Sequence, residues 1–383
     1  MKKIIKIILL LTLTFSIFLG EVFAEEKIKI GLLVPLTGKN SEIGQSIIKS
    51  TRLAINQIDN LSIEIIPKDT ASSPEVTLKS AKELEKLGIR IVIGPVFNEN
   101  LIYLNELSNL TFLSLTNKND NRSSNIINAG INATSQLNAI KKFIELNEIK
   151  KTIFLTSDSN YKNEIIQAIS NSRIKIIENY IYDTDPTKLT KQIEKITNYE
   201  RRKQNLEDEI KRLEESDENN IEKLIERLKK KDTLGNVNFD SLIIADFDES
   251  LKSVTTSLLY TDILPKEKYF ITLNQWFDES LLKETNLQPI YFPSINKENY
   301  EDFSLEYFNK YNQYPNQLSF LSYDLIGLIY FLILQNESII NEKIFEKKVL
   351  FKGKVGIFEI KKNKINHILN FYKVENKKFK KIF

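Results

Sequence analysis

The chain has 383 residues, with 54 Lys and Arg against 51 Asp and Glu, one His, no Cys and a formal net charge of +3. So small a net charge gives no long-range attraction to nucleic acid or anionic lipid, and we expect neither as a partner. The missing cysteines exclude disulfides, cysteine-bound metals, thiol nucleophiles and a lipidated cysteine.

Residues 1–24 have the three-part pattern of a secretory signal peptide. Three lysines precede an apolar run from Ile7 to Leu19, and Val22 and Ala24 stand where a signal peptidase reads small residues. We expect cleavage after Ala24; the alternative is an uncleaved N-terminal anchor. Because no later run approaches eighteen apolar residues, the pattern predicts a periplasmic protein without lipid or stable membrane insertion.

After the signal, short apolar runs alternate with helical patterns. Helices are predicted from Glu42 to Ile58 and from Pro74, which follows the capping residue Ser73. The strands predicted in this first series are Lys27–Val34, Ser62–Ile66, Arg90–Ile93 and Thr111–Leu115. Alternation at this spacing is typical of right-handed βαβ units and a parallel sheet.

The same rhythm restarts further along the chain. Its predicted strands are Thr152–Leu155, Ile174–Ile181, Ser241–Ala245 and Tyr269–Leu273. Helices at Tyr300–Tyr311 and Phe320–Leu334 follow, and then strands at Gly356–Ile360 and Ile368–Val374. Two βα series in a chain of this length predict an α/β protein with two doubly wound, parallel-sheet lobes.

One charged segment, Glu200–Asp232, interrupts the second series. It contains two apolar stripes at helical spacing, Leu206, Ile210 and Leu213 in its first half and Ile221, Leu224, Ile225 and Leu228 in its second. A polar stretch separates them, which predicts an antiparallel helical hairpin inserted into the second lobe at residues 199–234. The hairpin is either a solvated arm or a docking surface for another protein.

Little in the sequence indicates catalysis. The single histidine, His367, is interpreted as an exposed residue of a late strand, which disfavours Ser-His-Asp catalysis and histidine-rich metal sites. Gly94-Pro95 ends a strand without a phosphate-binding motif. Carboxylate chemistry alone stays open, but no acidic pair stands out. We therefore expect no enzyme, no catalytic residue, no metal and no cofactor.

Polar side chains recur directly after the predicted strands. Open parallel sheets bind ligands beyond the carboxyl ends of their strands, so these turns are the candidate ligand site. Trp276, the one tryptophan, suits either ligand stacking or packing between the lobes. The candidate ligand-binding residues are Asp69, Asn98, Ser114, Thr116, Asn117, Tyr161, Asp246 and Trp276.

These segments together resemble a known family. The opening from Ile28 to Gly38, the turn Ile93-Gly94-Pro95, the strand ending Leu113–Asn117 and the loop Asp158–Tyr161 are similar in order and spacing to type I periplasmic solute-binding proteins of the leucine/isoleucine/valine class. The resemblance implies two lobes joined by a three-segment hinge. We place its crossings near Ile131–Ser135, Phe292–Asn296 and Phe351–Val355. Lobe 1 would then hold residues 25–131 and 296–352, and lobe 2 residues 132–295 and 353–383.

A narrower resemblance is carried by the hairpin and three later segments. The segments Asp232–Gly235, Tyr323-Asp324 and Phe351–Phe358 resemble the alphaproteobacterial branch of penicillin-binding protein activators, which have the solute-binding fold. That name comes from an outer-membrane lipoprotein that stimulates peptidoglycan synthases. The present chain lacks the lipidation cysteine and a helical-repeat domain ahead of the binding fold.

The resemblance also implies roles for particular residues. Thr116 matches the family's loop that holds a ligand carboxylate and amino group, and Tyr161 matches a ligand-contacting tyrosine, although Lys162 follows it where the family has glycine. Asn98 and Glu99 stand where the family has serines. For pairing with a ligand ammonium, the candidates are Asp246 and Asp278.

Two functions of different classes follow. The first is a substrate-binding protein that captures an amino acid or amide-like solute between its lobes for ABC-type uptake, with a transporter permease as partner. The alternative is a non-catalytic envelope interaction protein that regulates a peptidoglycan synthase.

Overall fold

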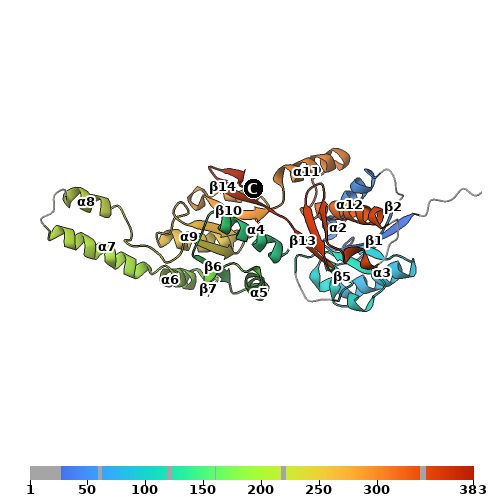
Figure 1. Ribbon diagram of the computed structural model, residues 1–383, viewed down its shortest axis with the longest axis horizontal. Helices are drawn as coiled ribbons and strands as arrows, with labels where there is room; N and C mark the ends of the chain where they lie inside the picture. The colour runs from blue at the N-terminus through green and yellow to red at the C-terminus, as the bar shows by residue number, and fades with distance from the viewer. Residues whose placement is uncertain (1–26, 59–62, 119–122, 160, 217–220, 337–341) are drawn as a thin grey trace, which may run out of the picture.

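The computed structural model describes residues 27–58, 63–118, 123–159, 161–216, 221–336 and 342–383. Two α/β lobes stand side by side, and a helical hairpin projects from the second of them (Figure 1). Each lobe is built on a mainly parallel sheet, as predicted. The expected signal peptide lies outside the described residues.

Lobe 1 has a five-stranded sheet in the order β2-β1-β3-β4-β5, parallel throughout. Its strands are β1 (Ile28–Val34), β2 (Ile63–Asp69), β3 (Ile91–Ile93), β4 (Thr111–Ser114) and β5 (Ile126–Asn128). Its helices are α2 (Ser41–Ile55), α3 (Pro74–Lys86), η1 (Asn98–Leu101), η2 (Leu104–Glu106), α11 (Lys297–Tyr311) and α12 (Ser319–Gln335). The Ser73 hydroxyl accepts the N–H of Val76 and caps α3, as expected.

Lobe 2 has a seven-stranded sheet in the order β15-β14-β10-β9-β8-β6-β7, in which β14 and β15 are antiparallel. The strands are β6 (Thr152–Ser157), β7 (Ile176–Tyr182), β8 (Ser241–Ala245), β9 (Tyr269–Thr272), β10 (Ile290–Ser294), β14 (Asn370–Glu375) and β15 (Lys378–Lys381). The helices are α4 (Ala133–Leu146), α5 (Lys162–Ser172), α6 (Pro186–Ile196), α9 (Asp248–Tyr260), α10 (Ser280–Lys283) and η3 (Thr285–Leu287).

The chain crosses between the lobes three times, and we call these crossings the hinge. Residues 129–132 lead from β5 to α4, which packs on lobe 2, and residues 295–296 lead from β10 to α11, both close to the expected places. The third crossing was placed wrongly, at Phe351–Val355. The chain crosses at 368–369 instead, because β14 joins the lobe 2 sheet only from Asn370.

A small antiparallel sheet beside lobe 1 explains that error. It consists of β11 (Val349–Lys352), β12 (Ile357–Lys361) and β13 (Lys364–His367), and η4 (Glu342–Phe345) precedes it. The expected lobe boundary at 352/353 would cut this sheet in two. The run predicted as one strand from Ile368 therefore begins two residues later, after the crossing.

Asp324 of α12 holds the turn between β11 and β12. Its buried carboxylate accepts the backbone N–H groups of Lys354 at 2.7 Å, Gly356 at 2.7 Å and Val355 at 3.2 Å. A Cβ at Gly353 would lie 2.5 Å from its Cγ, so only glycine fits there. Burial raises the pKa of Asp324 to about 7, against the opposing effect of these donors. The turn is thus fastened to lobe 1.

His367 is buried at the hinge, so its interpretation as an exposed residue is wrong. Only 3% of its surface is exposed, and its Nε2 lies 2.8 Å from the carbonyl oxygen of Ala129. Its backbone N–H donates to the Ser135 hydroxyl, at the start of α4. Strand β13 therefore contacts both the end of the lobe 1 sheet and the first helix of lobe 2.

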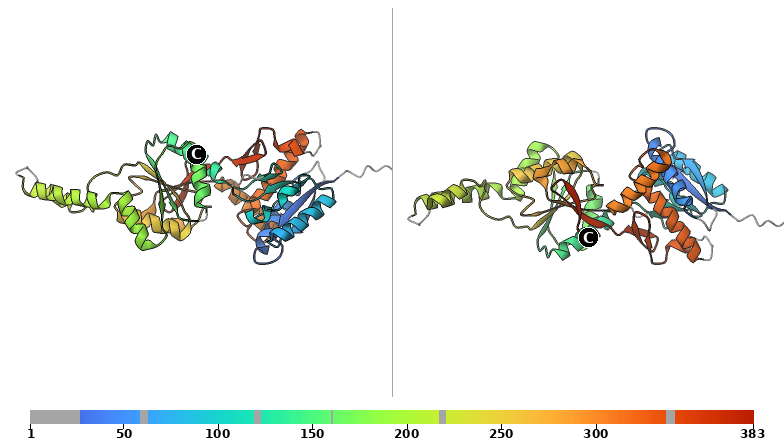
Figure 2. Two further views of the ribbon diagram at one scale, coloured as in Figure 1. Left: turned by 90° about the horizontal axis from the view of Figure 1, so that it is seen from below. Right: turned by 90° about the horizontal axis from the view of Figure 1, so that it is seen from above.

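The helical insertion has the predicted form. It consists of α7 (Tyr199–Glu214) and α8 (Ile221–Leu228), which pack against each other and extend away from both lobes (Figure 2). Within the described ranges, no helix is both long and apolar enough to span a bilayer.

Replacing Asp324 tests the turn. We expect Asp324→Ala to lower the free energy of unfolding by about 3 kcal/mol, because three backbone N–H groups, two of them buried, lose their acceptor. Urea denaturation followed by circular dichroism measures the change. Asp302→Ala, at an exposed position of α11, is the matched control and should change it by less than about 0.5 kcal/mol. Equal effects would contradict the assignment.

His367 predicts a pH dependence. Burial lowers its pKa from 6.5 to about 4, so the folded state favours the neutral ring. The stability it contributes is fully present above pH 6.5 and is lost as the pH falls toward 4. Between pH 7 and 5 this loss amounts to about 2 kcal/mol. In urea denaturation, the free energy of unfolding of His367→Gln should therefore fall by about 2 kcal/mol less than that of the native protein between pH 7 and 5. Equal falls in the two proteins would contradict the role of His367.

Candidate functional site

The topology brings the ligand-site candidates to facing edges of the two lobes. The hinge leaves lobe 1 from the carboxyl end of β5 and leaves lobe 2 from the carboxyl end of β10. Because parallel strands end at the same edge of a sheet, the loops after β1 to β4 and after β6 to β9 lie on the sides where the lobes meet. All eight candidate residues lie at these strand ends or within five residues after them.

In lobe 1, Asp69 fixes the loop that follows β1. Its carboxylate accepts the Leu36 N–H at 2.7 Å, the Thr37 hydroxyl at 2.6 Å and the Ala71 N–H at 2.8 Å. Partial burial opposes ionisation, yet these hydrogen bonds together hold the pKa of Asp69 below its usual value. Asp69 is therefore charged, and its oxygens are largely engaged by these hydrogen bonds, which fix the loop at the edge of lobe 1.

Ser114 and Thr116 form a fixed unit at the end of β4. Ser114 is fully buried; its hydroxyl donates to the Pro95 carbonyl at 3.1 Å and accepts the Thr116 N–H at 3.3 Å. The first hinge segment passes directly beside this unit. Gly130 donates its N–H to the Thr116 carbonyl, and a Cβ there would lie 2.4 Å from that oxygen. Ser114 therefore supports the loop, and Thr116 lies next to the hinge.

The loop residues around this unit differ in exposure. Asn117 is exposed and Asn98 is half-buried. Asn100, in the same loop as Asn98, is 1% exposed, and neither polar atom of its side chain has a hydrogen-bond partner among the described residues. An unpaired buried amide is costly, so Asn100 joins the site as a further candidate beside the eight residues named from the sequence.

In lobe 2, Asp246 organises the site. Its carboxylate accepts the Ser157 N–H and hydroxyl, both at 3.1 Å, the Tyr161 hydroxyl at 2.7 Å and the Tyr182 hydroxyl. Asp246 is 1% exposed, so these four donors satisfy a carboxylate that has almost no contact with solvent. Burial, together with the neighbouring Asp246, raises the pKa of both tyrosines. Asp246 therefore positions Tyr161.

Two members of this cluster were missed in the sequence. Ser157 ends β6 two residues beyond the predicted strand, and Tyr182 ends β7 one residue beyond its predicted strand. The second acidic candidate, Asp278, accepts the N–H and hydroxyl of Ser280 at the start of α10. Both acids expected to pair with a ligand ammonium are thus engaged by the protein itself.

Trp276 packs between the lobes. Its ring centroid lies 6.3 Å from that of Phe320, at the start of α12 in lobe 1. Its backbone is held in the left-handed region, at φ 50°, where its N–H donates to Asn274 at 2.9 Å. Asn274 in turn donates its N–H to Gln136 of α4. Of the two roles considered for Trp276, ligand stacking and packing between the lobes, this geometry agrees with the packing role.

The site offers hydroxyl and amide groups from both lobes. The described ranges contain no grouping of three or more His, Cys, Asp and Glu able to hold a metal ion. The two acids of the candidate set, Asp69 and Asp246, position loops by accepting hydrogen bonds from them. The geometry is suited to binding a polar molecule through neutral groups.

Sequence comparison gives a family match for part of the chain. Residues 27–198 match the sequence profile of a family described as periplasmic binding protein. No curated protein matches the chain.

Solved structures with the same fold cover nearly the whole chain. One is the branched-chain amino acid transporter substrate binding protein LivJ from Streptococcus pneumoniae with isoleucine (16% identity, 93% of this chain and 98% of that one, TM-score 0.53). Another is an ABC transporter solute binding protein from Rhodopseudomonas palustris with 3,4-dihydroxybenzoic acid (16%, 91% and 92%, TM-score 0.54). A third is the LpoA C-domain from Haemophilus influenzae, a regulator of PBP1A (13%, 93% and 100%, TM-score 0.60).

Proposed function

We propose that this chain, a type I periplasmic binding protein, captures a small polar solute between its lobes and delivers it to an ABC importer. The observation that supports this most is the pairing of two polar strand-end edges, each held by internal hydrogen bonds, across a three-segment hinge. A ligand that contacts both edges favours the closed arrangement of the lobes.

The ligand class follows from the groups at these edges. Thr116, Asn117 and Asn98 of lobe 1 and Tyr161 of lobe 2 carry hydroxyl and amide groups, which suit an amino acid or amide-like solute. The acids that would pair with a ligand ammonium are engaged elsewhere. The solute's carboxylate or amide end therefore dominates recognition. Isoleucine and 3,4-dihydroxybenzoic acid, bound by two similar structures, share a carboxylate.

Location follows from the same proposal. The signal-like residues 1–24 would direct export, and cleavage after Ala24 would leave the two-lobed protein free in the periplasm. There it would meet both the solute and the importer's permease.

Thermal unfolding with a solute panel tests the proposal. Binding to the folded state alone raises Tm by several degrees at saturating ligand, and we expect this from a member of a panel of amino acids, amides and aromatic acids. Isothermal titration then gives the affinity. Tyr161→Phe or Thr116→Val should weaken it about tenfold, the effect of one lost hydrogen bond.

Matched variants away from the site are the controls. Tyr180→Phe on β7 and Thr190→Val on α6 remove the same groups and should leave affinity unchanged. If the whole panel leaves Tm unchanged, solute capture is contradicted. If a solute raises Tm and neither Tyr161→Phe nor Thr116→Val weakens its binding, the ligand binds outside the candidate site.

A second candidate is a non-catalytic interaction protein that regulates a peptidoglycan synthase. The α7–α8 hairpin favours it, because it projects away from both lobes (Figure 1). The LpoA C-domain, of similar fold, is described as a regulator of PBP1A.

Deleting the hairpin tests this candidate. With residues 201–231 replaced by a short glycine-serine linker, a purified peptidoglycan synthase from the same cells should no longer be captured by the immobilised protein. The lobes should still fold, which circular dichroism and solute binding report. Capture that survives the deletion would exclude the hairpin as the docking element.

A further inference from the structure

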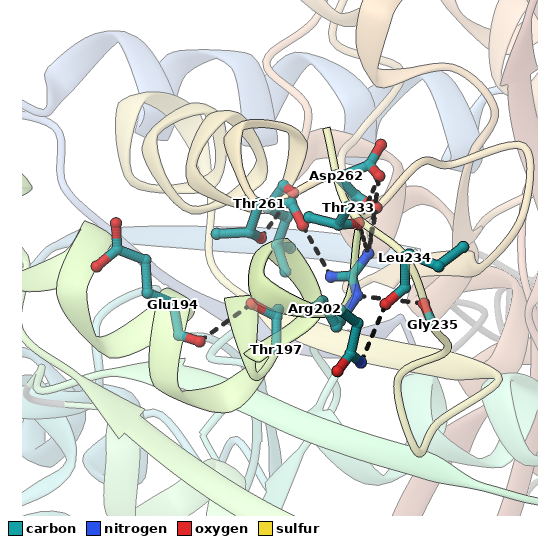
Figure 3. Close-up of polar contacts among 10 residues, drawn as sticks. Glu194, Thr197, Arg202, Thr233, Leu234, Gly235, Thr261 and Asp262 are labelled. Carbon is teal, nitrogen blue, oxygen red and sulfur yellow. Dashed lines mark hydrogen bonds and ion pairs between the residues drawn. The ribbon is translucent and has the colours of Figure 1, made fainter. Parts of the chain in front are cut away.

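The hairpin is rigidly fixed to lobe 2 through Arg202. Arg202 is 6% exposed, and its guanidinium donates to the Gly235, Thr261 and Asp262 carbonyls and, at 2.6 Å, to the Thr233 hydroxyl (Figure 3). Thr233 also donates to the Asp262 carboxylate at 2.7 Å. Burial lowers the pKa of Arg202, while the nearby Asp262 favours its charge. Arg202 therefore joins the start of α7 and the segment after α8 to the turn that follows α9 in lobe 2.

Beyond this fixed base, the hairpin has too little core of its own. Leu206 and Leu213 of α7 are buried, but none of the α8 side chains is, and Leu224 is 37% exposed. Yet α8 is strongly amphipathic, with its apolar residues on one stripe. Helices this short are marginal unless an apolar face is covered. The apolar stripe of α8 is only partly covered by α7.

The charges of the hairpin are separated along its length. The part nearer the body, residues 200–206 and 227–232, carries seven basic and two acidic side chains. The described part nearer the tip, residues 207–216 and 221–226, carries seven acidic and three basic ones. Pairs such as Arg212–Glu209 and Lys230–Glu226 form within the hairpin, but they are exposed and contribute little. The hairpin as a whole is nearly neutral, but the end nearer the body is basic and the end nearer the tip is acidic.

We propose that the hairpin is a self-association surface, and that two copies of this chain pair their hairpins antiparallel as a four-helix bundle. In that arrangement the acidic tip of each hairpin lies on the basic base of the other, around a two-fold axis. Such an interface is self-complementary, as a closed dimer requires. The stripe that contains Leu224 becomes the bundle core.

The shape of the molecule permits this pairing. The hairpin extends away from both lobes, and α7 alone spans about 24 Å (Figures 1 and 2). Antiparallel pairing therefore puts the two-lobed bodies at opposite ends of the bundle. A partner that was uniformly acidic or basic would meet a like charge at one end of the hairpin, whereas a second copy matches both ends.

Charge reversal tests the pairing. The base variant is Arg201→Glu, Lys203→Glu and Lys231→Glu, and the tip variant is Glu207→Lys, Glu215→Lys and Glu222→Lys; all six residues are exposed. Sedimentation equilibrium of residues 25–383 measures the dimer dissociation constant. Each variant alone should raise it about tenfold or more, because like charges then face each other at both contacts. Circular dichroism confirms that the variants fold.

Mixing the two variants gives the decisive result. A base variant paired with a tip variant has opposite charges at both contacts, so the mixture should form a heterodimer about as tight as the native dimer. Lys82→Glu, Lys86→Glu and Arg90→Glu, exposed on lobe 1, are the matched control and should leave the constant unchanged. A native chain that stays monomeric at 100 mM salt and about 100 µM protein, or variants whose mixture fails to associate, would overturn the proposal.

Discussion

The structure depends on where the chain leaves its two sheets. Both early crossings start at carboxyl ends of parallel strands, after β5 and after β10. Parallel strands end at one edge, so this single constraint turns every strand-end loop of one lobe toward the other. The third crossing is reinforced by β13, whose His367 contacts Ala129 at the start of the first crossing and Ser135 just after it. The polar edges thus face each other because of the connectivity, before any side chain is considered.

Side chains then decide which of these loops are rigid. The acids at the edges already accept hydrogen bonds from the protein itself. Asp69 accepts them from the loop after β1, and Asp246 from Ser157, Tyr161 and Tyr182. A buried carboxylate with several donors holds its surroundings in one arrangement, and removing a donor leaves charge unsatisfied. Recognition is consequently left to hydroxyl and amide groups near the hinge, such as Thr116.

The sequence predicts helices and strands well where the signal lies within a few neighbouring residues. The β-branched runs at β1, β8 and β9 stand out, and Ser73-Pro74 marks the start of α3. It fails where partners are distant along the chain. His367 looks exposed until Ala129 is brought beside it, and the turn after β11 looks like a crossing until Asp324 is found to hold it.

The candidate site divides in the same way. Its position could be predicted, because strand-end loops follow from the βα rhythm. The roles of its residues could not, because the donors of Asp246 come from β6, β7 and the loop before α5, and no spacing links them. The hairpin shows the opposite case. Its charge separation can be read from the sequence, but the contact of Arg202 with Thr233 that fixes its base cannot. A rigid base matters physically, since a flexible arm would lose more entropy on pairing than a fixed one. The same fixing keeps the bundle remote from the hinge, so self-association and lobe closure can proceed independently.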